Sequence, residues 1–253
     1  MSFKVKWAGA VIVLMLLLAS GGYEYLKSNQ YEDYLKTLTN EINSGKCTGF
    51  NLANLYYRRG ITYYEKGRYN LAIADYSKAI GINDSNARLY SNRGVAYDHV
   101  GRYDLAIADY KTAIELDPLS KRAYADLGNA YNNKGEYNLA ILNLSKAIKM
   151  APSNAGFYYN RGMAYYNSGK YDLAIADYGH AIELNPSNAL FYNNRGAVYY
   201  QKGQYEMAMA DYNEAIKIDP SHAASYYNRG EVYAKKGDIA LANADYKKAI
   251  ELV

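Results

Sequence analysis

The spacing of the prolines constrains this chain more than any other feature. The chain has four prolines, and each lies 34 residues from the next: Pro118, Pro152, Pro186 and Pro220. Two series of glycines keep the same period, one running from Gly60 to Gly230 and the other from Gly67 to Gly237. A fixed period of this length indicates a small structural element that stacks on copies of itself.

The repeated pattern fits two helices joined by a tight turn. Places within a repeat are counted from its first residue, which is residue 53 in the first repeat. Apolar or aromatic residues occupy the fourth, eleventh, seventeenth and twenty-fourth places, which gives each half of the repeat one apolar helical face. Glycine at place fifteen permits the turn, because it takes positive φ without steric cost. Glycine at place eight and alanine at place twenty are small where the helices approach closely, and proline at place thirty-two ends the second helix. The predicted repeats cover 53–86, 87–120, 121–154, 155–188, 189–222 and 223–253.

Tyrosine is the standard core residue of these repeats. The chain has 32 Tyr against 4 Phe and 1 Trp, and 22 of the tyrosines fall on the four core places. Four more precede residue 51, and the remaining six fall at places five and twelve of the predicted first helices. These six are Tyr57, Tyr159, Tyr227, Tyr64, Tyr166 and Tyr200.

The pattern resembles the tetratricopeptide repeat, a helix–turn–helix of 34 residues with the signature W-x2-L-G-x2-Y, A-x3-F and P. Tyrosine replaces the Trp and the Phe of that signature. The fourth repeat carries it as Tyr158, Gly162, Tyr165, Ala174, Tyr178 and Pro186. The resemblance implies an all-α fold, a right-handed superhelical solenoid of six repeats, which binds other polypeptides on a concave side lined by first helices.

One departure from the family pattern is regular. Five repeats carry Arg at place seven, where the family has Leu, and the same five carry Asp at place twenty-three. The third repeat has Leu127 and Asn143 at these places, and Leu144 instead of the next Tyr. Because the two places change together, we predict a partly buried Arg–Asp pair that ties the first helix to the second.

The N-terminal residues differ from the repeats in composition. Lys4 and Lys6 precede an uncharged run over residues 7–23, the arrangement that the export machinery recognises. We predict that residues 1–22 are a signal anchor or a cleaved signal peptide; a buried helix of the fold fits the lysines poorly. The repeats would then be membrane-anchored on the extracytoplasmic side, or exported to the periplasm or cell envelope in a bacterium. Residues 23–52 are predicted to form a capping helix and a linker.

The predicted binding residues lie on the exposed stripe of the first helices. Places five, nine and twelve share this stripe, and places two, six and thirteen extend it. The six tyrosines outside the core fall on it, and each offers a large, stiff contact area. Place six holds Asn92, Asn160, Asn194 and Asn228, whose amides can clamp an extended peptide backbone. Two alternatives to peptide binding stay open. The tyrosines pack between neighbouring repeats, and the recurring N-R-G sequence is only a common form of the first helix.

Composition argues against other functions. The three histidines, His99, His180 and His222, stand at unlike places, which argues against a metal site or a catalytic dyad. The single Cys47 permits no internal disulfide. A net charge of +4 without a basic cluster argues against nucleic-acid binding. We therefore predict no enzymatic activity and no cofactor.

The sequence thus predicts a protein-interaction scaffold that binds an extended peptide or a partner protein in the groove of the solenoid. The alternative is a membrane-tethered assembly factor that associates with itself through its C-terminal repeat, where no further helix follows Val253. In a third possibility, the partner docks on the opposite, convex face.

Overall fold

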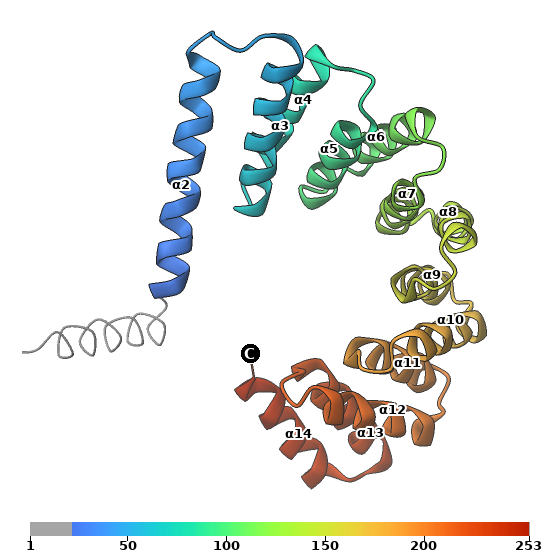
Figure 1. Ribbon diagram of the computed structural model, residues 1–253. Coiled ribbons are helices and arrows are strands. Elements are labelled where there is room, and N and C mark those ends of the chain that lie inside the picture. Colours follow the sequence, from blue (N-terminus) through green and yellow to red (C-terminus); the bar gives the residue numbers. More distant parts are fainter. Residues whose placement is uncertain (1–21, 253) are drawn as a thin grey trace, which may run out of the picture. The chain divides into compact units, whose positions relative to one another are not determined.

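The computed structural model describes residues 22–252, and the side chains of residues 30–252. All regular secondary structure in this range is helical, with thirteen α-helices numbered α2 to α14 (Figure 1). The chain divides into two compact parts, one ending at Gly101 and the other beginning at Arg102. The predicted signal or anchor segment falls outside the described residues, save for its last position. None of the described helices has the length and apolar character to cross a membrane.

The N-terminal part pairs the helices of the first repeat and places a further helix on each side. Helix α2 packs on α3, where it buries Leu35 and Leu38. From α3, Arg58 donates to the Tyr34 hydroxyl at 2.6 and 2.9 Å. Helix α3 begins four residues before the predicted position 53, directly after the extended Thr48. The bounds are α2 (Gly22–Asn43), α3 (Gly49–Glu65), α4 (Tyr69–Ile82) and α5 (Ala87–His99).

The C-terminal part repeats one hairpin of helices. After α6, α7 packs on α8, α9 on α10, α11 on α12 and α13 on α14 (Figure 1). The bounds are α6 (Tyr103–Leu116), α7 (Lys121–Lys134), α8 (Tyr137–Met150), α9 (Ala155–Asn167), α10 (Tyr171–Leu184), α11 (Ala189–Gln201), α12 (Tyr205–Ile218), α13 (Ala223–Lys236) and α14 (Ile239–Glu251).

The predicted punctuation of the repeats is confirmed. The place-fifteen glycines have positive φ, as in Gly135 at 86° and Gly169 at 75°. Helix α8 ends two residues before Pro152 and α10 ends two residues before Pro186, because proline cannot continue a helix. The start of α9 is capped by Asn154, whose side chain accepts from the backbone N–H of Gly156 at 3.0 Å.

Small residues let the two helices of a pair approach closely. A Cβ added to Gly162 would lie 2.8 Å from the Tyr178 ring, closer than real carbon contacts allow. In the third repeat, a Cβ on Gly128 would lie 2.7 Å from Leu144 Cγ. Ala174, at place twenty, is fully buried. The side chain at place twenty-four therefore fills the space that the glycine leaves.

The predicted Arg–Asp pair is present and bidentate. Arg161 Nε and Nη2 donate to the two carboxylate oxygens of Asp177 at 2.7 and 2.8 Å. The Asp177 side chain is buried, and the Arg161 side chain is 20% exposed. The same bonds join Arg59 to Asp75, Arg195 to Asp211 and Arg229 to Asp245. Each pair holds a first helix to its own second helix.

The arginine also reaches the preceding repeat. Arg161 Nη1 donates to the Ser145 hydroxyl at 3.0 Å, and Arg229 Nη1 donates to the Asn213 side-chain oxygen at 2.7 Å. Arg195 has Gly179 at the equivalent place, so this third contact has no side chain to accept it. One arginine thus couples its own helix pair to the one before it wherever place twenty-five is polar.

Candidate peptide-binding surface

The predicted asparagines and tyrosines meet in an order that the sequence did not reveal. Asn92 Nδ2 donates to the Tyr57 hydroxyl at 3.1 Å, and Asn194 Nδ2 donates to the Tyr159 hydroxyl at 2.8 Å. In both bonds, place six of one repeat contacts place five of the repeat before it. These two amides therefore already hold neighbouring first helices together.

A variant of this contact joins α11 to α13. Place five of the fifth repeat is Asn193, which accepts from Asn228 Nδ2 at 3.0 Å and from the Ser225 hydroxyl at 3.2 Å. Asn193 and Ser225 are both buried. His222 Nδ1 lies 2.7 Å from the Ser225 oxygen and completes a polar cluster between the two helices.

The contact is missing between α7 and α9. Place five of the third repeat is Ala125, which has no hydroxyl to accept from Asn160. Asn160 makes no side-chain hydrogen bond within the described residues, and the same is true of Asn129 and Asn133 on α7. All three have exposed or half-exposed side chains. We refer to Asn129, Asn133 and Asn160 as the amide surface.

The tyrosines at places five and twelve are less available than the sequence suggested. Tyr159 packs between helices, with its ring 5.2 Å from that of Phe191 and 5.7 Å from that of Tyr178. Burial raises the pKa of Tyr159, which is the physical mark of a hydroxyl removed from water. Tyr227 lies at 52% exposure on α13, while Tyr57, Tyr64, Tyr166 and Tyr200 are half-buried.

The ring of each tyrosine at place twelve packs against the ring of the first tyrosine of the following helix. The ring centroids are 5.4 Å apart for Tyr64 and Tyr69, 5.7 Å for Tyr166 and Tyr171, and 5.6 Å for Tyr200 and Tyr205. These pairs close the turn between the helices of the first, fourth and fifth repeats.

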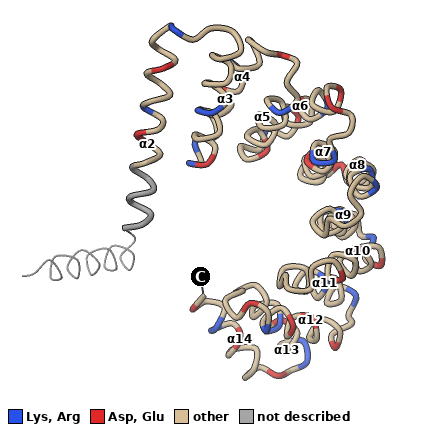
Figure 2. The backbone as a smooth tube through the Cα atoms, viewed as in Figure 1, with Lys and Arg blue, Asp and Glu red and all other residues tan. Residues whose placement is uncertain are grey.

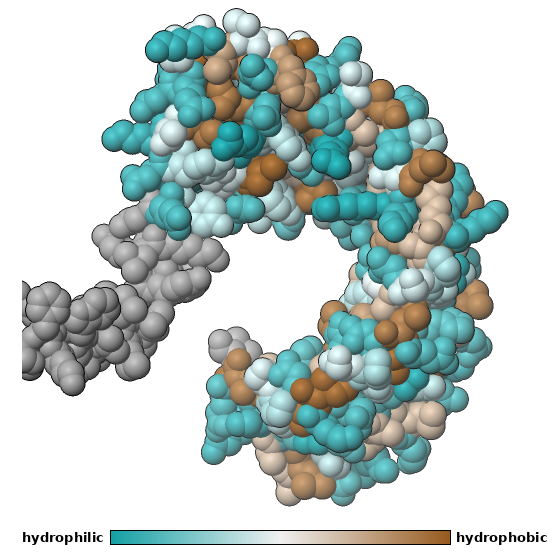
Figure 3. Space-filling view, viewed as in Figure 1, coloured by the Kyte–Doolittle hydropathy of each residue, from teal (hydrophilic) through white to brown (hydrophobic). Residues whose placement is uncertain are grey.

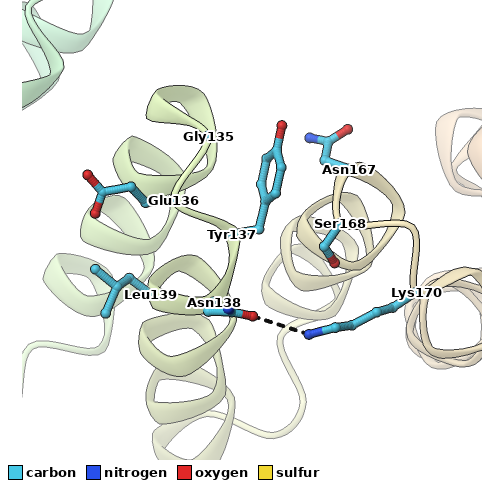
Figure 4. A pocket seen from close by; sticks show the side chains of 8 residues that line it. All are labelled: Gly135, Glu136, Tyr137, Asn138, Leu139, Asn167, Ser168 and Lys170. Carbon is cyan, nitrogen blue, oxygen red and sulfur yellow. Dashed lines mark hydrogen bonds between the residues drawn. The ribbon is translucent and has the colours of Figure 1, made fainter.

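The third repeat has an open pocket at this turn. Asn132 takes the place of the tyrosine and accepts from Asn167 Nδ2 at 3.0 Å. Beside them lies a pocket of about 650 Å³, lined by Tyr137, Asn138, Asn167, Lys170 and neighbouring residues. Figure 4 shows the Tyr137 ring standing between α8 and α9 with the Asn167 amide near it, while Glu136 and Leu139 point the other way. We refer to this as the Tyr137 pocket.

Charge does not concentrate on either part of the molecule. Figure 2 shows acidic and basic residues interleaved along the helices. Several of them bridge consecutive repeats, as in Lys134 with Asp104 at 2.8 Å and Lys202 with Asp172. Among the residues that the structure describes, there is no group of acidic, histidine or cysteine side chains that could hold a metal ion.

Apolar residues reach the surface in separate patches, which Figure 3 shows in brown between polar areas. Among the large apolar side chains of the C-terminal helix pair, Ile250 is the most exposed, at 77%. It borders an apolar hollow of about 700 Å³ together with Tyr227 and Tyr246. Tyr246 donates to Glu231 at 2.5 Å, and this bond raises the pKa of the Tyr246 hydroxyl to about 12.

Sequence reasoning overlooked the special position of the third repeat on the exposed face. The signal was present, because Ala125 and Asn132 stand where the first and fourth repeats both have Tyr. What could not be seen was that the tyrosine at place five engages the asparagine of the next repeat. Without that contact, the loss of a tyrosine does not identify which asparagine becomes free.

Models of known protein families match the repeats of this chain. A family model described as TPR repeat matches residues 60–98, 128–169, 164–203 and 198–237. Models described as tetratricopeptide repeat match 87–118, 109–141 and 223–252. No curated protein matches the sequence.

Solved protein structures are also similar to this chain. The crystal structure of MamA is 31% identical, with a TM-score of 0.57 over 63% of this chain and 93% of that chain. YrrB, described as a TPR protein with an unusual peptide-binding site, is 29% identical, with a TM-score of 0.54 over 70% of this chain and 91% of that chain. A tetratricopeptide repeat protein from Parabacteroides merdae is 20% identical, with a TM-score of 0.76 over 94% of this chain and 92% of that chain, and supports the fold alone. With its repeats matched over more than half of its length, this chain belongs to the tetratricopeptide repeat family.

Proposed function

We propose that this chain is a protein-interaction scaffold, without catalytic activity, that binds an extended segment of a partner polypeptide on the exposed face of its first helices. The observation that carries the proposal is the amide surface of α7 and α9. There Asn129, Asn133 and Asn160 have no side-chain hydrogen bond within the described residues. Backbone recognition requires polar groups that are available on a repeated framework.

Amide side chains suit a ligand of varied sequence. Each asparagine offers two N–H donors and one acceptor oxygen, which complement the carbonyl and N–H of an extended backbone. At Asn160, no internal bond has to be broken before a peptide binds. At Asn92 and Asn194, the Nδ2 donors already serve Tyr57 and Tyr159, so peptide binding there would compete with the contact between repeats.

The remaining predicted residues would take secondary roles. Tyr166 and Tyr200 lie on the same helix face, half-buried, and could contact side chains of the peptide. Tyr57, Tyr64 and Tyr227 would do so elsewhere on the stripe. The likeness to YrrB supports peptide binding as the mode of interaction, because that relative is described as having a peptide-binding site.

The test compares Asn160→Ala with Asn194→Ala in the full chain, using peptides selected from a random library displayed on phage. We expect Asn160→Ala to weaken the selected peptides about tenfold, the worth of one or two hydrogen bonds, without lowering the melting temperature. Asn194→Ala is the matched control, because it breaks an internal bond and should lower stability instead. If no peptide is enriched, or if Asn160→Ala binds as the wild type does, the proposed function is wrong.

We also propose that residues 7–23 tether the repeats to a membrane or direct their export, with the repeats on the extracytoplasmic side. The support is the uncharged run that follows Lys4 and Lys6. Cell fractionation and N-terminal sequencing of the expressed chain separate the outcomes. An intact N-terminus in the membrane fraction indicates an anchor, a new N-terminus near residue 22 indicates a signal peptide, and an intact chain in the cytosol contradicts both.

The second candidate function is self-association through α13 and α14. The apolar hollow beside Ile250 favours it, because the equivalent residue Ile182 is buried beneath the next repeat. Sedimentation of the full chain over a range of concentrations measures the effect. We expect Ile250→Glu to convert a concentration-dependent dimer into a monomer, and a wild-type chain that stays monomeric would exclude this function.

A further inference from the structure

In the first, fourth and fifth repeats, the first tyrosine of the second helix is covered by another ring. Tyr171 is covered by Tyr166, and Tyr205 by Tyr200. In the first repeat, Tyr69 has two partners, since Tyr64 lies 5.4 Å away and His99 stacks on it at 4.6 Å and 14°. Aromatic rings in such arrangements stabilise each other beyond the area that they bury.

In the part of the chain that the structure describes, Tyr137 has no such cover, and the same is true of Tyr103 in the second repeat. Tyr137 makes no ring contact within the described residues, because Asn132 replaces the tyrosine at place twelve and Asn167 stands where the second repeat has His99. The pocket of about 650 Å³ lies where those rings would be. Its volume is in the range of roughly 300–1,000 Å³ that is common for ligand sites.

The walls of the pocket combine one aromatic face with polar groups. Asn167 Nδ2 is committed to Asn132, which leaves the Asn167 oxygen as an acceptor. Lys170 donates to Asn138 at 3.2 Å across the lower edge, as the dashed line in Figure 4 shows. An aliphatic side chain would leave the Asn167 oxygen unsatisfied, whereas a ring with a polar donor can stack on Tyr137 and bond to that oxygen.

The contact between His99 and Tyr69 shows what such an occupant looks like. The imidazole lies flat on the Tyr69 ring, while its Nε2 is 2.7 Å from the Tyr64 hydroxyl. It is a planar ring supplied from the next repeat, with one polar atom in a hydrogen bond. Nothing in the third and fourth repeats supplies such a ring to Tyr137 within the described residues.

We propose that the Tyr137 pocket binds an aromatic side chain of the partner polypeptide, stacked on Tyr137 and hydrogen-bonded to Asn167. The inference rests on the proposed peptide binding and identifies what the peptide must contain. Tyrosine, histidine and tryptophan are the side chains that supply both a ring and a polar atom that can donate to the Asn167 oxygen.

The position of the aromatic residue in the peptide follows from helix geometry. Asn160 and Asn167 are seven residues apart on α9, which is about 10 Å at 1.5 Å per residue. An extended chain covers that distance in about three residues. The aromatic residue should therefore lie about three positions from the peptide group that Asn160 binds.

The first experiment uses small probes and the full chain. N-acetyl-tyrosine amide is titrated against the chain labelled with ¹⁵N, and N-acetyl-leucine amide serves as the comparison. We expect the tyrosine probe to shift the side-chain amide signals of Asn132 and Asn167, and the leucine probe to leave them unchanged. Equal shifts with both probes, or no shift with either, would overturn the proposal.

The second experiment closes the pocket from within. Asn167→His should place an imidazole on Tyr137, as His99 lies on Tyr69, and weaken the tyrosine probe and the selected peptides about tenfold. Gln201→His is the matched control: it sits at the same place one repeat later, beside Tyr171, which Tyr166 already covers. Tyr137→Leu removes the aromatic face and should abolish the difference between the two probes.

The outcomes separate this inference from the proposed function. Peptides that need Asn160 but bind Asn167→His as well as they bind the wild type would refute the aromatic pocket and leave the scaffold function intact. Selected peptides without an aromatic residue at a constant position would do the same. Conversely, if no peptide is selected but the tyrosine probe shifts Asn132 and Asn167, the pocket stands and the extended-peptide function fails.

Discussion

In the third repeat, α7 and α8 meet through Leu127 and Leu144, whereas in the fourth, α9 and α10 meet through Arg161, Asp177 and Tyr178. The approach of the helices is the same, because the glycines of both repeats leave less than 3 Å for an added Cβ. One framework therefore accepts either an apolar interior or a buried ion pair with a tyrosine.

The choice in the third repeat shows why the residues change together. Leu127 and Leu144 are buried, and Asn143, at the place of the aspartate, donates to the Leu139 carbonyl at 2.8 Å. With Leu instead of Arg, an aspartate at 143 would be a buried charge without a cation, which is costly. The neutral asparagine removes that cost by satisfying its amide within its own helix.

The difference extends to the exposed face. The repeat with the apolar interior also carries Ala125 and Asn132 in place of two tyrosines, and so leaves Asn160 and Tyr137 without their usual partners. The fourth repeat keeps its tyrosines and closes both positions. The comparison therefore locates the candidate binding site at the least regular repeat, where the contacts that elsewhere stabilise the stack are replaced by available polar groups.

Breaking the ion pair of the fourth repeat has the largest expected effect. Arg161→Ala leaves the buried Asp177 without its cation and should lower the free energy of unfolding by about 3–5 kcal/mol. Arg161→Leu with Asp177→Asn, which copies the third repeat, should lose less. Urea denaturation of the full chain measures both. If the double variant is as unstable as Arg161→Ala, the ion pair does not explain the loss. Arg122→Ala, which removes an exposed arginine from α7, is the control for Arg161→Ala.

Alkaline pH separates the two interiors further. Burial raises the pKa of Tyr178, whereas Leu144 has no proton to lose. Because the tyrosine ionises near pH 10 in the unfolded chain but stays neutral in the folded one, its stabilisation is complete below pH 10 and is lost as the pH rises toward the folded pKa. The loss should be about 1.4 kcal/mol per pH unit.

The measurement is the stability of Tyr178→Phe against wild type between pH 9 and pH 12. We expect the two to be similar at pH 9 and the phenylalanine variant to be progressively more stable above pH 10. Tyr31→Phe, which changes a tyrosine on α2, is the control and should follow wild type. Parallel curves for Tyr178→Phe and wild type would show that the buried hydroxyl does not set the alkaline limit.

The smallest effect concerns the link between consecutive repeats. Ser145 accepts a hydrogen bond from Arg161, and Gly179 is the equivalent residue for Arg195. Gly179→Ser should therefore add to α10 a hydroxyl that accepts a hydrogen bond from Arg195. An added Cβ at Gly179 lies 3.9 Å from Arg195 Nη1, which is ordinary contact. The new bond and the better helix propensity should stabilise the chain by about 1 kcal/mol, detectable as a higher melting temperature. Ser145→Gly should lose a similar amount; an unchanged melting temperature in both variants would contradict the link.

The sequence by itself determined the repeat, the turns that punctuate it and its interior. Proline and glycine at fixed places restrict the backbone locally, and the joint change of places seven and twenty-three reveals a contact between helices because a buried charge needs its partner. These features lie within one repeat, so a single period of the sequence contains all their partners. The start of α3 before residue 53 was missed, because the boundary pattern comes from repeats that have another repeat ahead of them.

The tertiary structure alone decided which polar residues remain available. All four asparagines at place six look alike in the sequence, yet Asn92, Asn194 and Asn228 are engaged 35 residues away and Asn160 is not. Likewise, Tyr137 is a core tyrosine by its place, and only the packing of α7, α8 and α9 leaves its ring uncovered. Availability depends on the partner across the repeat boundary, and that partner is set by how the helices stack.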